Sequence, residues 1–550
     1  MKLQNISFLL LVFLLVSCDP LDTKIDTLIT QEQLDSDYSK LRNLGYAPYS
    51  FIKNGFYTID GNIAAAMSDE AAYTKTSSSV KLFNEGSWNK YNNPDNVYLN
   101  CYQGIRAANF FLDYSTDYKQ KLAQNRDTLS DGGYQYRLSV NDIAWMRAES
   151  RILRAFFYFE LIKRYGDVPV VKEVLPANES SNSPRNGFDE VVSYIISDID
   201  YSRDSLQANW KSFDSERDGR FTKGAAMALK SRILLYAASP RHNATNDITK
   251  WESAAKAAYD VIRLNQYSLD GNYRNLFLES NSTTSNEVIL SHRCGATNGM
   301  EVANYPIGTP GGNSGITPSQ NLVEAYEYKG TPDPNNPYAN RDPRLSLSIV
   351  VNNSAWNGRT MEIYSGGTDD PNNTNASRTG YYLKKFLLEN LYLTQGETRI
   401  HNWIMFRYAE ILLNYAEAMN EAYGPSDNNG YSLTACEAVN LVRGRTGIGM
   451  PPVSTSDKNE MREKIKHERR VELAFEEHRF WDLLRWKDAG EIMNLPLRGI
   501  QITKIDDTTF NYNISTVEQR KFDASRMYLY PIPYSEITKS NGVLTQNPNW

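Results

Sequence analysis

The sequence predicts a mainly α-helical protein, in which degenerate tetratricopeptide-like helical pairs form a scaffold and a loop-rich insertion carries short strands. Three observations predict this fold class. The tetrapeptide Ser-Arg-Ile-Leu at residues 150–153 recurs at residues 231–234, each time inside an Ala-rich helical pattern followed by aromatic residues. From about residue 265 to 402, Gly, Asn, Ser, Thr and Pro cluster between short alternating runs. Helical patterns resume at about residue 403, so the insertion divides one helical unit.

The predicted organisation is a single unit from about residue 38 to 550. Its helical scaffold covers about 38–264 and 403–493, the insertion covers about 265–402, and a C-terminal loop region covers 494–550. Because the two helical blocks lie far apart in the sequence and share the same build, we expect them to pack together.

Helix ends are marked by local signals. Tyr-Gly pairs occur at 165–166 and 423–424, and Gly is favoured just after the last residue of a helix. Small residues at helix crossings with large residues between them are typical of packed helical pairs. We expect helices at residues 101–112, 144–165, 189–200, 251–264 and 409–423.

The stretch from Met461 to Lys487 lacks Gly and Pro and carries apolar residues on more than one face. This pattern predicts a continuous helix that is surrounded by neighbouring elements on several sides. Charged residues lie between the apolar ones, and we expect them to form partly buried ion pairs. The expected pairs are Arg469–Glu472, Glu476–Arg479, His478–Asp482 and Asp482–Arg485.

Two catalytic interpretations of this stretch are weaker than the structural one. His467-Glu468 begins like the HExxH motif of zinc proteases, but Val471 occupies the position of the second His. His478 and Asp482 lie one helical turn apart and could bind a metal or transfer a proton. Because the chain has only five His and Arg is dense here, a structural pair is favoured.

Three consecutive blocks of the sequence resemble a known family. IKHERRVELAFEEHRFWDLLRW (465–486) is similar to the C-terminal signature of the SusD-like (RagB/SusD) family, and FRYAEILLNYAEAMNE (406–421) and AVNLVRGRTG (438–447) are similar to its adjoining blocks. Further similar segments, such as RDPRL at 341–345, extend the resemblance over nearly the full chain. The resemblance implies an outward-facing surface lipoprotein that captures glycans for a SusC-like TonB-dependent outer-membrane transporter.

The N-terminus has the features of a lipoprotein signal. Residues 1–17 contain Lys2 and an apolar run that is too short to span a bilayer. The run ends in Leu-Val-Ser-Cys at 15–18, which resembles a bacterial lipobox, so we expect lipidation of Cys18. The alternative is an ordinary signal peptide with an incidental Cys. Polar residues 18–37 then form a tether to the outer membrane.

Composition narrows the possible functions. The net charge of −6 argues against nucleic-acid binding, and three Cys remain after Cys18, so no complete disulfide framework is expected. The sequence contains no GxSxG, P-loop, CxxC or Rossmann fingerprint, and no carboxylate pair stands out for glycoside hydrolysis. The 36 Tyr and 9 Trp residues, with many Asn, suit sugar binding, because rings stack on sugar C–H faces and amides bond hydroxyls.

Two loops rich in Asp and Asn, 333–336 and 369–373, could bind Ca²⁺ through oxygen ligands. Neither has EF-hand spacing, and both are more typical of solvated turns. No metal or other cofactor is therefore predicted.

Candidate glycan-binding residues are polar or aromatic residues in predicted loops, because helix aromatics are expected in the core. Trp88 ranks first, since it lies among Gly, Ser and Asn residues, where a ring is hard to bury. The alternative for Trp88 is packing beneath the 101–112 helix as a hydrophobic staple. The full candidate set is Trp88, Asp69, Cys294, Asn298, Tyr305, Trp356, Arg378 and Tyr392.

The sequence favours a non-catalytic protein that captures a poly- or oligosaccharide at the cell surface and delivers it to a transporter. A secreted glycan-active enzyme is one alternative. A protein-scaffolding lipoprotein is another, because tetratricopeptide helices often bind peptides. The glycan, its linkage and the oligomeric state stay open at this point.

Overall fold

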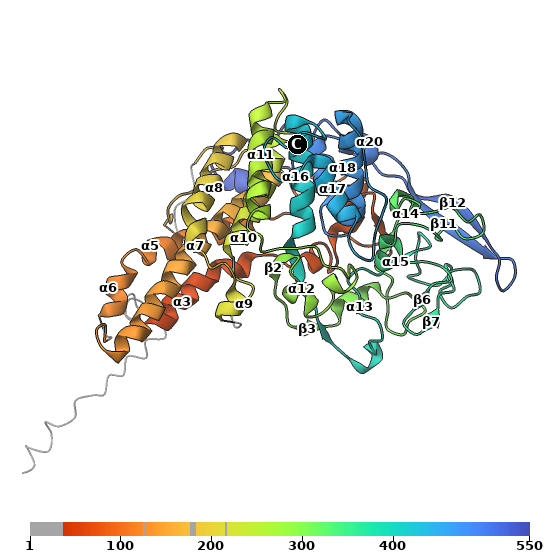
Figure 1. The fold of residues 1–550 in the computed structure, drawn as a ribbon, viewed down its shortest axis with the longest axis horizontal. Coiled ribbons are helices and arrows are strands. Elements are labelled where there is room, and N and C mark those ends of the chain that lie inside the picture. The colour runs from red at the N-terminus through yellow and green to blue at the C-terminus, as the bar shows by residue number, and fades with distance from the viewer. Residues whose placement is uncertain (1–36, 125–126, 177–182, 215–216) are drawn as a thin grey trace, which may run out of the picture.

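The computed structural model describes residues 37–124, 127–176, 183–214 and 217–550 (Figure 1). The predicted signal peptide, Cys18 and nearly all of the tether lie outside these residues. Within the described part of the chain, no helix is both long and apolar enough to cross a membrane.

The fold is mainly helical, which confirms the predicted class (Figure 1). The described helices are α3 (Tyr38–Tyr46), α4 (Lys81–Asn84), α5 (Tyr98–Tyr114), α6 (Tyr118–Ala123), α7 (Asp131–Tyr165), α8 (Phe188–Ser202), α9 (Trp210–Phe213), α10 (Lys223–Ala238), α11 (Ile248–Ile262), α12 (Asn281–Thr284), α13 (Gly299–Asn304), α14 (Gln320–Ala325), α15 (Arg344–Ser348), α16 (Tyr408–Tyr423), α17 (Ala435–Arg443), α18 (Lys458–Glu472), α19 (Arg479–Trp486), α20 (Ala489–Ile492) and α21 (Tyr534–Lys539).

The long helices pack in sequence-adjacent pairs, as in tetratricopeptide-like scaffolds. Helix α7 packs on α5 and α8, α10 packs on α11, and α16 packs on both α11 and α17, which joins the two helical blocks. The repeated tetrapeptide buries its Ser and Ile in both α7 and α10. Gly166 and Gly424 follow α7 and α16 with φ values of 71° and 89°, so both Tyr-Gly stops end a helix as predicted.

The described strands form small antiparallel two-stranded ladders. They are β1 (Ala71–Tyr73) with β4 (Ile316–Pro318), β2 (Val288–His292) with β10 (Trp403–Arg407), β3 (Ala296–Thr297) with β9 (Arg399–Ile400), β5 (Ile349–Val350) with β8 (Tyr382–Leu383), β6 (Ala355–Trp356) with β7 (Arg359–Thr360), and β11 (Leu497–Lys504) with β12 (Phe510–Glu518). Strand β2 lies near the start of the insertion and β10 directly follows its end, so the β2–β10 ladder closes the insertion at its base.

The β11–β12 hairpin corrects the prediction that residues 494–550 are a loop region. Its strands pair from Leu497 opposite Glu518 to Lys504 opposite Phe510, and the hairpin projects from the body at the right of Figure 1. A sequence signal was present, because β-branched and aromatic residues alternate with polar ones on both sides of the Asp506–Asp507 turn.

One hydrophobic core runs through most of the molecule and takes residues from both helical blocks and from the insertion. A second, smaller core of Leu41, Phe111, Leu122, Ile143 and Met146 lies among α3, α5, α6 and α7. These helices form an arm at the left of Figure 1, and α3, the first described helix, lies in it.

The prediction of one continuous helix from Met461 to Lys487 is wrong. Helix α18 ends at Glu472 and α19 begins at Arg479, and between them Phe475 and Glu477 adopt φ values of 67° and 62°. Left-handed backbone is unfavourable for non-Gly residues, so surrounding contacts must hold it. The Phe475 amide donates to the carboxylate of Glu70 at 3.1 Å, and neighbouring Glu476 is held by buried cations.

The charges of this stretch are buried as expected, but most of them pair with distant residues. The carboxylate of Glu472 meets Arg344, Arg407 and Arg445 at 2.8, 2.7 and 2.6 Å. Burial alone would raise the pKa of Glu472, yet these guanidinium groups hold it well below its usual range. The buried ion network formed by Glu472 and its neighbours therefore links α18 to three other segments.

Of the four predicted local pairs, Asp482–Arg485 forms, at 2.8 Å. The carboxylate of Asp482 also receives Arg469 at 2.9 Å, so its predicted partner His478 is displaced. Arg479, predicted to pair with Glu476, instead reaches the carboxylate of a residue far away in the sequence, Asp69.

Candidate functional site

Three of the predicted aromatic platform residues are inside the protein. Trp88, Tyr305 and Trp356 are 2%, 0% and 0% exposed, so the prediction that these rings face solvent is wrong. Trp88 is covered by C-terminal residues, because its ring lies 4.7 Å from those of Tyr530 and Trp550. Phe83 adds a third ring at 4.8 Å, so the ring packs within an aromatic cluster.

Tyr305 and Trp356 cover each other. Their rings meet edge to face at 5.7 Å within the base of the insertion. The Tyr305 hydroxyl donates to the carbonyl of Leu388, so its polar end is engaged as well. The Gly-rich and Asn-rich flanks predicted exposed loops, but Trp356 lies in β6, Tyr305 directly follows α13, and both are buried.

Asp69 is buried, and its carboxylate forms ion pairs with two arginines of the protein. Its carboxylate pairs with Arg479 at 2.8 Å and with Arg470 at 2.6 Å, which connects the N-terminal segment to the α18–α19 region. Contact of Asp69 with a glycan is therefore contradicted, because its oxygens are already occupied in the interior.

Arg378 and Tyr392 are exposed, as predicted for contact residues. Arg378 donates to the carbonyl of Val517 on β12, and Tyr392 is 61% exposed in the insertion. Arg378 lies beside the β11–β12 hairpin, whereas Tyr392 belongs to a segment that contacts Tyr305 through Leu388 and the neighbour of Trp356 through Asn390.

Cys294 and Asn298 lie close to one another and to an exposed ring that the sequence did not single out. Tyr57 is 38% exposed, and a Cβ placed on Gly299 would lie 2.9 Å from its hydroxyl. The Cys294 sulfur accepts a hydrogen bond from Asn54 at 3.1 Å, which holds the Tyr57 segment against the insertion. The sequence signal for Tyr57 was the Asn54-Gly55 pair, a turn signal that lies two residues before it.

A groove begins beside Cys294 and follows strand β2. It consists of two adjoining hollows of about 300 and 270 Å³ that share Asp218, Gly219, Arg220, Leu290 and Ser291. One wall is the scaffold around α9 and the start of α10, and the other is the beginning of the insertion. Arg293, which lines one hollow, is followed in the chain by Cys294. We call these two hollows, together with the neighbouring surface of Tyr57, Cys294 and Asn298, the β2 groove. Strand β2 lies toward the lower side of the body in Figure 1.

The groove carries groups that suit a hydroxylated ligand. Gln266 and Asn286 present exposed amides, which both donate and accept hydrogen bonds. Tyr49 and Tyr267 contribute half-buried rings to the walls. Burial lowers the pKa of His292, so its imidazole is neutral at pH 7 and offers one donor and one acceptor. Amides, neutral imidazole and rings together match the alternating polar and apolar faces of a sugar.

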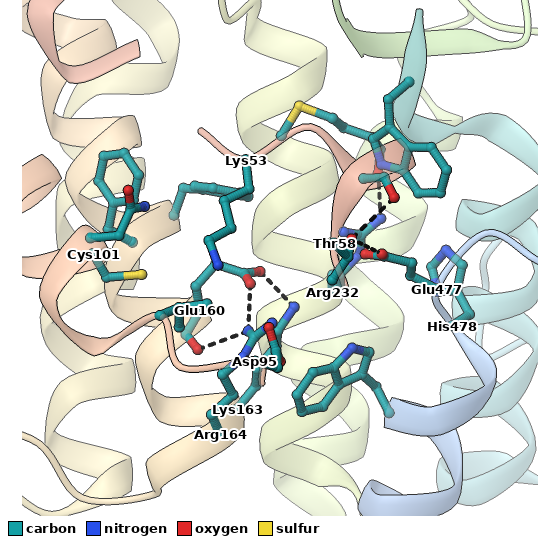
Figure 2. A pocket seen from close by; sticks show the side chains of 18 of the residues that line it. Lys53, Thr58, Asp95, Cys101, Glu160, Lys163, Arg164, Arg232, Glu477 and His478 are labelled. Atoms are coloured by element: carbon teal, nitrogen blue, oxygen red, sulfur yellow. Dashed lines mark hydrogen bonds and ion pairs between the residues drawn. The ribbon is translucent and has the colours of Figure 1, made fainter. Parts of the chain in front are cut away.

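A third hollow is smaller, at about 110 Å³ (Figure 2). Glu160 pairs there with Lys163 and Arg164, both at 2.6 Å, and the Thr58 hydroxyl hydrogen-bonds the carboxyl of Glu477. Pockets for organic ligands usually measure roughly 300 Å³ or more. This cavity is therefore too small for an oligosaccharide, and we do not assign it to glycan binding.

Two side chains that line this third hollow, Glu477 and His478, have strongly shifted pKa values. Burial raises the pKa of Glu477 to about 7, although Thr58 and nearby cations oppose the shift. Burial also lowers the pKa of His478 well below its usual value, so its ring is neutral. Figure 2 shows both side chains on the same side of the cavity, opposite Glu160.

The two loops considered for Ca²⁺ have their carboxylates engaged. Asp369 is fully buried and pairs with Arg359 at 2.6 Å, and Asp333 accepts the amide of Asn335 at 2.9 Å in a turn. Across the described ranges, no group of three or more His, Cys, Asp or Glu side chains is placed to hold a metal ion.

Comparison with solved structures defines the class of protein. A SusD-like protein from Bacteroides fragilis superimposes with a TM-score of 0.78 at 28% identity, covering 95% of this chain and 99% of the other. A SusD-like carbohydrate-binding protein from the same species gives 0.76 at 25% identity, covering 92% and 99%. The tetratricopeptide-like scaffold with its small ladders is thus the SusD-like fold.

Sequence comparison gives the family itself. The SusD family profile matches residues 263–550, and a second profile, described as starch-binding associating with outer membrane, matches residues 21–235. SusD-like protein P38 of Formosa agariphila is 28% identical over 374 residues, which cover 65% of this chain and 69% of that protein. The chain belongs to the SusD family, which confirms the resemblance of its C-terminal blocks. Proteins of this family are non-catalytic and associate with the outer membrane, so the chain is not an enzyme.

Proposed function

We propose that this protein captures a poly- or oligosaccharide at the outer surface of the cell, in the β2 groove, and delivers it to a partner TonB-dependent outer-membrane transporter. Family membership supports the ligand class, since one similar structure is described as carbohydrate binding and one matching profile as starch-binding. The transporter partner and the outward orientation extend the family's outer-membrane association.

The observation that carries the proposal is the position and lining of the groove. It lies where the rigid scaffold meets the loop-rich insertion, an arrangement that holds recognition loops in place. The two adjoining hollows make an elongated site, which suits several sugar units in a row. The amides of Gln266 and Asn286 line one hollow, and the exposed Tyr57 ring belongs to the neighbouring surface.

Tyr57→Ala tests this site. Its exposed ring can stack on a sugar face, so we expect glycan affinity to fall about tenfold to a hundredfold, equivalent to about 1–3 kcal/mol. The melting temperature should change by less than about 2 °C, because the side chain is 38% exposed. Affinity gel electrophoresis against a glycan panel identifies the ligand, and isothermal titration calorimetry then measures both proteins.

Tyr91→Ala is the matched control. Tyr91 is 71% exposed, and its ring lies 5.0 Å from that of Tyr534, outside the β2 groove. We expect it to bind glycan like the wild type. If Tyr91→Ala loses binding and Tyr57→Ala keeps it, the ligand binds at the Tyr91 surface and the groove assignment is wrong. If no glycan in the panel binds the wild type, the proposed function itself fails.

A further inference from the structure

The charge balance of the β2 groove indicates which glycans it accepts. Its cationic side chains are Lys211, Arg217, Arg220 and Arg293. The carboxylates in contact with the three arginines are Asp142, Glu149, Asp214 and Asp218. Every arginine of the groove therefore has a carboxylate partner, and Lys211 lies exposed at the rim.

Arg220 is the most deeply held of these cations. It is 5% exposed, donates through Nε to the Glu149 carboxylate at 3.0 Å, and donates through Nη1 to Asp142 at 2.9 Å. Both carboxylates are buried as well. An anionic ligand would have to compete with these fixed partners, and a charged group left unpaired in the interior is costly.

The outer arginines are also neutralised. Arg217 pairs with Asp142 and, at 2.8 Å, with Asp214. Arg293 pairs with Asp218 at 2.6 Å. Their side chains are 44% and 25% exposed, so this is the most accessible ion pair of the groove. A sulfate or carboxylate that approaches Arg293 meets the carboxylate of Asp218 beside it, so attraction and repulsion largely cancel.

The remaining groups favour hydroxyls. The ring of His292 is neutral, so it adds no charge to the groove, and its Nδ1 atom is buried. The exposed amides of Gln266 and Asn286 donate and accept hydrogen bonds, as do sugar hydroxyls. A sulfate or ionised carboxylate only accepts, so it cannot satisfy the amide oxygens, which are acceptors.

We propose that the β2 groove selects neutral glycans and rejects uronate-rich or sulfated ones, with Asp218 as the residue that enforces this choice. The inference rests on the proposed glycan-capture function and adds the substrate class. It predicts that binding of the cognate glycan is nearly independent of ionic strength, because no net charge is neutralised on binding.

The test compares two ligand sets by isothermal titration calorimetry. The neutral set contains oligosaccharides of glucans, fructans and mannans, and the anionic set contains oligogalacturonates and sulfated galactans. We expect the wild type to bind one or more neutral glycans, with a Kd that changes less than twofold between 50 and 500 mM NaCl (about a threefold change in Debye length). Binding to the anionic set should be at least about tenfold weaker.

Asp218→Asn should shift this selectivity. The change frees Arg293, so the ratio of anionic to neutral affinity should rise about threefold to tenfold and should fall again with salt. The double variant Asp218→Asn, Arg293→Gln removes the freed cation and should reverse the gain. Asp507→Asn, at the exposed tip of the β11–β12 hairpin, makes the same charge change elsewhere and should leave the ratio unchanged.

The outcomes separate this inference from the proposed function. Tight, salt-sensitive binding of only anionic glycans by the wild type overturns the inference and leaves glycan capture standing. Neutral binding with an unchanged ratio in Asp218→Asn also overturns it, since Asp218 would then not set the choice. Binding of no glycan in either set overturns both.

Discussion

Glu477 should make the protein less stable as the pH rises, and Glu477→Gln should remove that effect. Burial raises the pKa of Glu477 from 4.5 to about 7, so the folded state holds a proton there that the unfolded state releases between these values. Stability linked to this group is complete below about pH 4.5 and is lost as the pH rises toward 7. A shift of this size corresponds to about 3 kcal/mol, and because Glu477 is only partly buried, solvent screening reduces the expected loss to about 2–3 kcal/mol.

Thermal unfolding of the two proteins between pH 5 and pH 8 measures the effect. Glutamine keeps the size of the side chain and can still accept from Thr58 (Figure 2). For a chain of 550 residues, the unfolding entropy is roughly 1 kcal/mol per degree, so the variant should melt about 2–3 °C above the wild type at pH 8. At pH 5 the two should melt within about 1 °C of each other.

The control is Glu463→Gln on α18, where the side chain is 71% exposed. It should show no difference from wild type that depends on pH in this range. A Glu477→Gln protein that is less stable than wild type at pH 8, or a difference that is the same at both pH values, would refute the assignment of a protonated carboxyl in the cavity.

Two further changes test buried packing and anchoring. Trp88→Ala should lower the free energy of unfolding by about 3–5 kcal/mol, because the ring is 2% exposed and packs against Tyr530 and Trp550. Thermal unfolding measures this loss, and glycan titration of the folded protein should show unchanged affinity. An unchanged melting temperature would contradict the packing. Cys18→Ala should abolish partition of the protein with the outer membrane, because acyl chains on Cys18 are the predicted anchor. Cell fractionation with surface labelling measures this, and a variant that still fractionates with the membrane would disprove the anchor.

Local signals in the sequence were sufficient to predict the helices of the scaffold. The repeated tetrapeptide at 150–153 and 231–234, and the Tyr-Gly stops, depend on neighbouring residues, and α7, α10 and α16 follow them. The break between α18 and α19 could not be predicted in this way. It requires left-handed backbone at Phe475, and contacts with Glu70 and with cations far away in the sequence hold that region in place.

The candidate site was only partly predictable for the same reason. The flanks of Trp88 describe a loop, but its burial depends on residues near the C-terminus, which no local pattern connects to it. Cys294 and Asn298 were predicted because they lie in a polar loop of the sequence, and their contact with a glycan stays a prediction. The groove itself arises where the scaffold around Asp218 meets the insertion, a contact that only the tertiary structure defines.

The buried ion network limits how freely this fold can be recombined. The insertion contributes Glu287, Arg344 and Lys385 to it, and these side chains meet Arg407, Glu472 and Glu476 of the helical block at 2.6–2.8 Å. A graft that exchanged the whole insertion for a foreign one would leave these partners unpaired, at about 3–5 kcal/mol for each broken pair. Ligand specificity can therefore diverge between relatives by single substitutions in the β2 groove, whose lining residues lie outside this network. The insertion as a whole, in contrast, must be inherited together with the helical residues that neutralise its charges.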